Sequence, residues 1–356
     1  MQSCNNPPIF VVGAPRSGTT MLAAMLASHP AIAAGPETQF FSKLPTKKLE
    51  GACQDAVWPN AAVQLLMSLT LADQKVGTLF ATDETQLTNF LAARKPSISA
   101  ILEALTVPFS EAHGKKRWAE KTPNHIQHLG TIRRLWPDAK IIRIIRDPRD
   151  VGLSTRKIPT FSDQILPNIY VWQEWNGRAE RFLAADPGSM TVRYEDIVDD
   201  PEDQLRRICD HIGEDFDPAM TRFEQSAQSV SSANEIWKGQ VSDGMTASRK
   251  YAWKSDLPDT IRPVCDLVCH ELLIAHGYEH GPPPRKTRTA FRLSRAYLEK
   301  QEDALIRDAA KGVRWLPVDD PEKADRVVDH PQYSQFRNPV MVLRLMLGKA
   351  QSWMEL

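Results

Sequence analysis

The first 280 residues alternate between short apolar runs and segments in which apolar residues recur at helical spacing. Residues 9–12 form a continuous apolar run between Pro8 and Gly13, which predicts a buried parallel strand. Beyond the following loop, a helix is predicted that ends at His29-Pro30. Its apolar positions are Met21, Leu22, Met25 and Leu26. The chain therefore opens with a strand, a glycine-containing loop and a helix.

The same reading predicts further strands and helices downstream. Residues 140–145 are a second strong strand, and residues 190–194 are a weaker third. Thr122 and Pro123 have the residue types of an N-cap and first turn, for a helix ending at Pro137. Strands that alternate with helices predict an α/β fold, in which a P-loop-like parallel sheet is flanked by helices. Other expected helices are several within 43–117, one around Trp172, Trp175 and Phe182, and one from Asp200 to Gly213.

Composition sets the scale of the molecule. The 356 residues carry 44 Lys and Arg against 44 Asp and Glu, so no global basic bias points to nucleic acid. We expect one domain over residues 1–284, with 43–117 as a helical acceptor-side insertion. The Gly-Pro run at 281–284 separates it from a basic and amphipathic appendage at 285–356. That appendage could contact an anionic membrane or polysaccharide, act as a solvated arm, or assemble a homo-oligomer.

The chain contains no run near the roughly 20 apolar residues that a membrane span needs. We expect no signal peptide, because residues 1–8 are short and polar. The five cysteines are scattered, which argues against a disulfide framework and favours a cytoplasmic location. Cys265 and Cys269 are interpreted as buried thiols, and no metal site is expected.

The loop between the first strand and helix has the glycine spacing of a P-loop. Gly13 and Gly18 let the backbone curl around an anion, and the following helix adds its positive end. Ser17, Thr19 and Thr20 can donate hydroxyl hydrogen bonds. Thr19 stands where an NTPase has its lysine, so the loop is predicted to hold a phosphate without triphosphate–Mg²⁺ chemistry. Arg16 can supply the missing positive charge.

The string PRSGTT after an apolar strand resembles the 5′-phosphosulfate loop of the PAPS-dependent sulfotransferases, where PAPS is 3′-phosphoadenosine 5′-phosphosulfate. The resemblance covers about residues 7–280. It implies that residues 16–20 hold the 5′-phosphate of PAPS, without a metal. The family also places an Arg at a strand end and a Ser eight residues later on the 3′-phosphate, here Arg146 and Ser154. A guanidinium fork suits a phosphate, and an eight-residue gap lets the chain turn at Pro148 and bring the hydroxyl back to the same anion.

Further segments follow the family pattern. Tyr194, in Tyr-Glu-Asp after the third strand, either contacts the nucleotide or packs at the strand end. Arg156 and Lys157 can strengthen the 3′-phosphate site. Ser248, Arg249 and Lys250, ahead of Trp253, resemble a late segment that closes over the nucleotide.

The segments PRSGTT, His-Pro and Gly-Pro-Glu-Thr resemble the branch of tyrosylprotein sulfotransferases and bacterial relatives. This resemblance implies Glu37 as the base that takes the acceptor proton, with His29 as a rival. It implies Lys121 beside the bridging oxygen of the leaving phosphate, with Arg16 also catalytic. Gln39 stands where the tyrosylprotein enzymes carry Arg, which weakens a protein-tyrosine assignment.

The function predicted is in-line transfer of a sulfuryl group from PAPS to an acceptor hydroxyl or amine, releasing PAP. The acceptor is open: a carbohydrate, a lipid-linked glycan, a small molecule or a peptide tyrosine. One alternative is a degenerate P-loop kinase or NTPase. Another is a catalytically silent PAP-binding module, which would have no use for Glu37 or Lys121.

Overall fold

The computed structural model describes residues 6–156, 158, 161, 164–227, 229–230, 250–259 and 261–281. These residues form two compact units. The first contains the described residues up to 13, those of 18–145, and those from 179 to 230. The second contains residues 14–17 and the described residues of 146–178 and 250–281. The predicted appendage at 285–356 lies outside the described residues.

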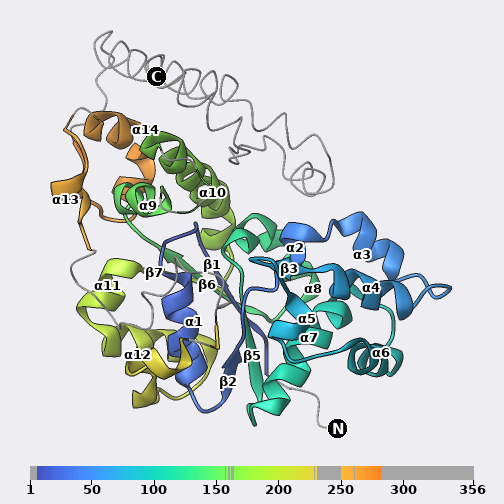
Figure 1. Ribbon diagram of the computed structural model, residues 1–356. Coiled ribbons are helices and arrows are strands. Elements are labelled where there is room, and N and C mark those ends of the chain that lie inside the picture. The colour runs from blue at the N-terminus through green and yellow to red at the C-terminus, as the bar shows by residue number, and fades with distance from the viewer. Residues whose placement is uncertain are drawn as a thin grey trace. The chain divides into compact units, whose positions relative to one another are not determined.

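The first unit is built on a parallel sheet with the strand order β2-β5-β1-β6-β7 (Figure 1). Its central strand β1 pairs with β5 and β6, so that Val11 lies beside both Lys121 and Ile142. The carboxyl ends of parallel strands share one edge, which is where ligands of open α/β sheets bind. The strands are β1 (Ile9–Val12), β2 (Ile32–Ala34), β5 (Arg117–Lys121), β6 (Lys140–Ile145) and β7 (Ser189–Arg193).

The α/β prediction is confirmed, but two strands of the sheet were not predicted. Strand β2 has only 3 residues, which is too short for a periodic signal. Strand β5 reads Arg-Trp-Ala-Glu-Lys, which lacks the apolar run expected of a buried parallel strand, yet all 5 residues are buried. Its charged side chains are buried because other parts of the chain pair with them. Arg117, for example, forms an ion pair with Glu214 at 3.0 Å.

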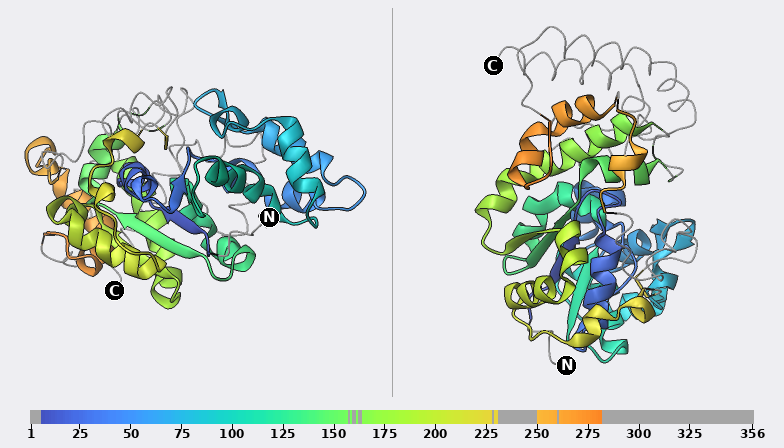
Figure 2. Two further views of the ribbon diagram at one scale, coloured as in Figure 1. Left: turned by 90° about the horizontal axis from the view of Figure 1, so that it is seen from below. Right: turned by 90° about the vertical axis from the view of Figure 1, so that its left-hand side faces the viewer.

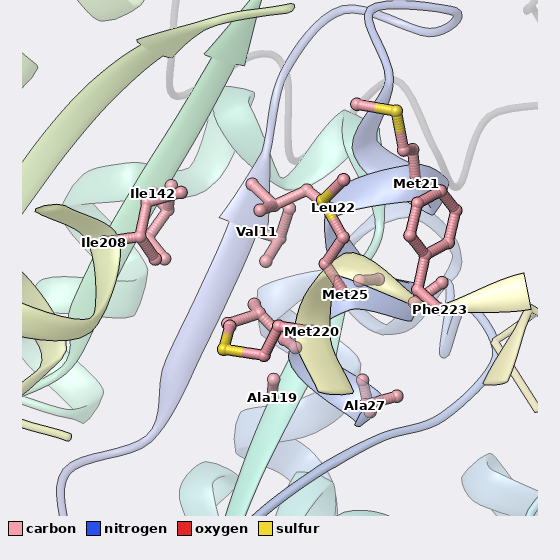
Figure 3. Close-up of a cluster of buried hydrophobic side chains, with 14 of the residues drawn as sticks. Val11, Met21, Leu22, Met25, Ala27, Ala119, Ile142, Ile208, Met220 and Phe223 are labelled. Atoms are coloured by element: carbon pink, nitrogen blue, oxygen red, sulfur yellow. The ribbon is translucent and has the colours of Figure 1, made fainter. Parts of the chain in front are cut away.

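One face of the sheet packs against helix α1 (Thr19–Ser28) (Figure 3). Ile9 and Val11 point to this face, where Leu22, Met25 and Ile208 complete a fully buried cluster. Burial of each such side chain contributes about 1.5–3 kcal/mol, which fixes the loop before α1 onto a rigid base. The other elements on this side are α11 (Tyr194–Asp199), α12 (Pro201–Ile212), and the 3₁₀ turns η2 (Pro218–Thr221) and η3 (Glu224–Ser226).

The opposite face carries an aromatic cluster. Phe10 alternates with Ile9 and Val11, so its ring lies on this side, 5.6 Å from Trp118 and 5.2 Å from Trp136. The indole N–H of Trp136 donates to Glu103 of the covering helix at 2.9 Å. The elements here are α7 (Ile98–Ala112), η1 (Pro123–His128) and α8 (Leu129–Leu135).

Two predicted boundaries need correction. The third strand ends at Arg193, and Tyr194 begins α11. The helix expected from Thr122 to Pro137 is instead a 3₁₀ turn followed by α8, which ends at Leu135. The Thr122 hydroxyl does not cap it, because that hydroxyl donates to Glu120 at 2.6 Å. By contrast, the predicted helix caps at Asp200 and Gly213 are both confirmed.

Residues 40–92 form a set of short helices and a two-stranded hairpin, gathered to one side of the five-stranded sheet (Figures 1 and 2). Helix α6 begins with a complete capping box between Asp83 and Gln86. The elements are α2 (Phe40–Lys43), α3 (Thr46–Ala52), α4 (Asn60–Ser68), β3 (Thr70–Leu71), β4 (Gln74–Lys75), α5 (Val76–Leu79) and α6 (Glu84–Ala92).

The second unit is helical. It contains α9 (Pro148–Thr155), α13 (Trp253–Asp256) and α14 (Arg262–Ala275). Helix α10 (Ile165–Ala185) begins in this unit, and from residue 179 its residues belong to the first. The Trp172 and Trp175 side chains are buried, as their spacing predicts.

Candidate functional site

The loop that leaves β1 adopts the backbone conformations that its sequence requires. A Cβ atom at Gly13 would lie 2.5 Å from the Ile144 carbonyl oxygen, so only glycine fits. Gly18 has φ +100°, and a Cβ there would lie 2.6 Å from the Tyr194 ring. Arg16 is also left-handed, with φ 68°. Left-handed residues at alternating positions turn backbone N–H groups toward a common point, which is the geometry of an anion-binding loop.

Helix α1 begins directly after this loop. Gly18 is its N-cap and offers no side chain to the first N–H groups of the helix, which lack carbonyl partners within the helix. Thr19 and Thr20 are buried in the first turn, and Ser17 is fully buried. The Ser17 hydroxyl oxygen has no hydrogen-bond partner among the described residues. A buried hydroxyl without a partner costs free energy, so Ser17 is suited to donate a hydrogen bond to an anion held by this loop.

The second predicted anion motif meets this loop within the second unit. The Arg16 Nε atom donates to the Ser154 hydroxyl oxygen at 3.1 Å, across 138 positions of sequence. Arg146 donates from Nη1 to the Arg16 carbonyl oxygen at 3.4 Å. Ser154 lies in α9, which follows Arg146, and Pro148 occupies the first turn of that helix, as predicted. Two guanidinium groups and a hydroxyl therefore gather around the 14–17 loop.

Asp150 of α9 contacts both this cluster and the chain around α13. The Asp150 carboxylate accepts from the backbone N–H groups of Tyr251 and Trp253 at 2.8 and 2.9 Å, and lies 3.7 Å from Arg146. Burial raises the pKa of Asp150 above its usual value, although Arg146 and the two N–H groups oppose that shift. Asp150 thus ties the chain around α13 to α9.

Arg149 lies fully buried inside the second unit. Its guanidinium donates to both oxygens of Asp147 at 2.9 and 2.7 Å, to Asp266 at 2.9 Å, and lies 3.6 Å from the Trp253 ring centre. Burial lowers the pKa of Arg149, but the hydrogen bonds and charge of Asp147, with Asp266, raise it overall. Arg149, Asp150 and Asp266 carry no local sequence signal that marks them as site residues.

The predicted base and leaving-group lysine form a pair in the first unit. Lys121, the last residue of β5, is fully buried, and its Nζ atom lies 3.0 Å from Glu37 Oε1. Gln39 donates from Nε2 to Glu37 Oε2 at 2.6 Å. Glu37 follows β2, so the two neighbouring strands deliver the two side chains. Both carboxylate oxygens of Glu37 therefore have a donor, which holds the side chain in one orientation.

The remaining candidates are less closely grouped. Tyr194 begins α11 and packs against Gly18. Arg156 is exposed at the end of α9, and Lys250 lies 5.6 Å from the Tyr251 ring. Ser248, Arg249 and Lys157 lie outside the described residues. The rival base His29 is buried at the end of α1, where its Nε2 atom contacts the Asp215 carbonyl oxygen at 2.8 Å.

The described cysteines Cys53, Cys209, Cys265 and Cys269 are free thiols. Burial raises the pKa of Cys209 to about 11, and raises those of Cys265 and Cys269 as well. High thiol pKa values make nucleophilic chemistry unfavourable at these positions. Within the part of the chain that the structure describes, no cluster of three or more metal-ligating side chains occurs. No helix in that part is long and apolar enough to cross a membrane.

Comparison with known proteins assigns this fold and loop to a class. A sequence profile of the sulfotransferase family matches residues 7–218. The chain therefore belongs to the sulfotransferase family.

Individual relatives are distant. Protein-tyrosine sulfotransferase A of Caenorhabditis elegans is 23% identical over 342 residues, which span 91% of this chain and 81% of that protein. Nodulation protein NoeE of Sinorhizobium fredii is 26% identical over 307 residues, spanning 76% of this chain and 66% of its own length. The solved sulfotransferase domain from the curacin biosynthetic pathway superposes with a TM-score of 0.53 and 21% identity, over 78% of this chain and 99% of that domain. This structural likeness shows a shared fold.

Proposed function

We propose that the protein transfers a sulfuryl group from PAPS to an acceptor hydroxyl or amine and releases PAP. The observation that carries the proposal is the meeting of Arg16 with Ser154 and Arg146. The PRSGTT loop and the Arg146–Ser154 motif lie far apart in the sequence, and each fits one phosphate. A nucleotide with phosphates at both its 5′ and 3′ positions uses both motifs, whereas ATP or GTP has no 3′-phosphate for the second.

In the proposed reaction the acceptor oxygen or nitrogen forms a bond to the PAPS sulfur, and the sulfur–oxygen bond to the 5′-phosphate breaks. The acceptor proton passes to the Glu37 carboxylate. The bridging oxygen and its electron pair leave with PAP, so atoms and charge balance. Lys121 and Arg16 supply positive charge for the leaving oxygen. The protein thus contributes positioning, a base and charge stabilisation.

The chemical class of the acceptor is inferred from the relatives and from Gln39. Several of the relatives bear the names of protein-tyrosine sulfotransferases, which favours a hydroxyl acceptor. This chain carries Gln39 beside Glu37, where the tyrosylprotein enzymes that it resembles have Arg. The proposed acceptor is therefore a hydroxyl compound, either carbohydrate, small molecule or peptide, and we assign its selection to the helices of residues 40–112. A mass-spectrometric comparison of sulfated products in cell extract, incubated with PAPS and with or without the protein, would identify it.

Thermal unfolding with added nucleotides tests the proposed function. PAP at 100 times its Kd should stabilise the fold by about 2.7 kcal/mol and raise the Tm. Arg146→Ala should lose most of this shift, whereas the control Arg134→Ala, on the exposed side of α8, should retain it. A shift with ATP·Mg²⁺ or GTP·Mg²⁺ and none with PAP would overturn the proposal in favour of a P-loop NTPase or kinase. PAP binding without transfer to any component of the extract would indicate a silent binding module.

A further inference from the structure

The carboxylate of Glu120 lies immediately before Lys121 in β5 and is almost completely buried, with 1% of its surface exposed. Three side chains donate hydrogen bonds to it. Thr122 donates from Oγ1 at 2.6 Å, Thr38 from Oγ1 at 2.8 Å and His125 from Nδ1 at 2.8 Å. A buried carboxylate without such donors would carry a large desolvation cost. Glu120 is therefore the centre of a compact polar network inside the first unit.

Each of the three donors also accepts a hydrogen bond from the backbone. Thr122 Oγ1 accepts from the N–H of Gln39 at 3.3 Å, and Thr38 Oγ1 from that of Phe40 at 3.3 Å. His125 Nε2 accepts from the N–H of Phe41 at 3.2 Å. Residues 39–41 begin helix α2, where N–H groups have no carbonyl one turn earlier. One carboxylate thus organises three consecutive backbone N–H groups through three intermediates.

The hydrogen-bond directions in this network are determined by its members. A carboxylate can only accept, and a backbone N–H can only donate. Each threonine hydroxyl must therefore point its proton to Glu120. His125 must carry its proton on Nδ1, because its Nε2 lone pair faces the Phe41 N–H. The network admits one arrangement of protons, which makes it a rigid spacer.

The two groups that this spacer joins are those of the proposed reaction. Glu120 is covalently adjacent to Lys121, and the backbone of Gln39, which it holds through Thr122, is two residues from Glu37. Gln39 has a left-handed backbone with φ 56°, an unfavourable conformation for a residue other than glycine. In that conformation its side chain donates to Glu37.

We infer that Glu120, acting through Thr38, Thr122 and His125, is a positioning residue that sets the geometry of the Glu37–Lys121 pair. This inference rests on the proposed function for the roles of Glu37 and Lys121. Stability alone would not require this network, because both partners of a buried hydrogen bond can often be replaced by apolar groups of the same shape at little cost. A network of one charge and three donors instead orients the groups it joins, as outer-sphere partners do around metal ligands.

Amide hydrogen exchange tests the network without any substrate. The wild-type amides of residues 39–41 should exchange slowly. Thr122→Val, which keeps the shape and removes the hydroxyl, should speed exchange in a peptide containing these residues by at least about 10-fold through local opening. Thr122→Ser should restore protection. Thr106→Val is the matched control, because Thr106 is equally buried but donates only to Leu102 of its own helix at 3.4 Å. Unchanged exchange in both Thr122→Val and Glu120→Gln would overturn the inference.

Transfer kinetics then test whether the Glu120 network positions Glu37, the proposed base. The probe is ³⁵S-labelled PAPS with the acceptor pool of a cell extract. Thr122→Val should lower the transfer rate by about 10- to 100-fold, because small misplacements of a catalytic group are costly. Its affinity for PAP should stay within 2-fold of wild type, a threshold chosen to separate the two effects, and the serine variant should recover the rate. Equal loss of rate and PAP affinity would indicate general damage instead. A wild-type protein that binds no PAP would remove the proposed function, whereas the exchange result would still decide whether Glu120 organises residues 39–41.

Discussion

At the scale of single residues, the site depends on charges that are buried together with their partners. Lys121 is fully buried, and Glu37, which is 6% exposed, pairs with it at 3.0 Å. Glu120 is likewise buried together with its partners. Its burial alone would raise its pKa, but the electrostatic interaction and hydrogen bond with His125 and the hydroxyls of Thr122 and Thr38 lower it overall. Glu120 therefore remains anionic in the interior of the first unit.

Replacing the proposed base should separate binding from chemistry. Glu37→Gln keeps the shape of the side chain and its contacts with Lys121, so PAP binding should be unchanged. It cannot accept the acceptor proton, so the transfer rate should fall by about 100- to 10,000-fold. Calorimetry with PAP and transfer of labelled sulfate measure the two effects. Glu50→Gln, an exposed change in α3, is the control, and undiminished transfer by Glu37→Gln would remove Glu37 as the base.

The lowered pKa of Glu120 predicts how stability depends on pH. An unfolded Glu binds its proton near pH 4.3, and the folded carboxylate binds it only at lower pH. The stabilising contribution is thus fully present above about pH 4.3 and is lost as the pH falls through the folded pKa. The free energy of unfolding can be measured with urea at several pH values from 7 to 3. At the acidic end, the value for wild type should approach that for Glu120→Gln. A constant difference between the two across this range would contradict the pKa direction.

At the scale of elements, short helices are held where they are by side chains that cap or bridge them. Helix α9 supplies Ser154 to the Arg16 cluster, and its Asp150 binds two N–H groups at the start of α13. Arg149 joins α9 to α14 through Asp266. The position of Ser154 therefore depends on residues about a hundred positions away in sequence.

Asp150→Asn should loosen the segment around α13. An asparagine has one acceptor oxygen, and its amide nitrogen would face a backbone N–H, so one of the two hydrogen bonds is lost. We expect the affinity for PAP to fall by about 10-fold, which corresponds to about 1.4 kcal/mol. Titration calorimetry measures this change, and hydrogen exchange in residues 250–256 should accelerate. The control is Asp256→Asn, an exposed change in α13, which should have neither effect. Equal PAP affinity and equal exchange in the two variants would show that Asp150 does not position the segment around α13.

At the scale of the whole molecule, hydrogen bonds and ion pairs between segments distant in sequence accompany the apolar core of the first unit. Arg117 of β5 is the clearest example. Its guanidinium donates to the Pro7 carbonyl oxygen at 2.6 Å, to that of Ile212 at 2.7 Å, and to Glu214 at 3.0 Å. It thereby connects the entry to β1, strand β5 and the end of α12, three segments that are far apart in the sequence.

Arg117→Met should destabilise the fold substantially. It leaves two carbonyl groups and a largely buried carboxylate without their donor, so the expected loss in free energy of unfolding is about 3–5 kcal/mol. Arg206→Met breaks an exposed ion pair with Glu202 and should cost less than about 1 kcal/mol. Urea unfolding of the two variants gives the comparison. A similar, small loss in both would mean that the Arg117 contacts add little net stability.

The sequence alone determined the elements whose signal is local. Strands β1 and β6 are continuous apolar runs, and the turn after β1 needs glycine at two defined positions, so both were predictable. The contacts of Arg16 with Ser154 and Arg146 join motifs that were also recognisable, because each of these residues occurs within a short motif of fixed spacing. Family membership agrees with that reading.

Only the tertiary structure decided the rest. Strand β5 could not be recognised, because its charged residues look exposed until their partners are known, and those partners lie up to 110 positions away. The same is true of Glu120, whose donors come from two separate segments, and of Asp150, which binds residues about a hundred positions later. Burial of a charge is a property of the surroundings that folding assembles. A one-dimensional pattern records the side chain itself, whereas the groups that neutralise it become neighbours only when the chain has folded.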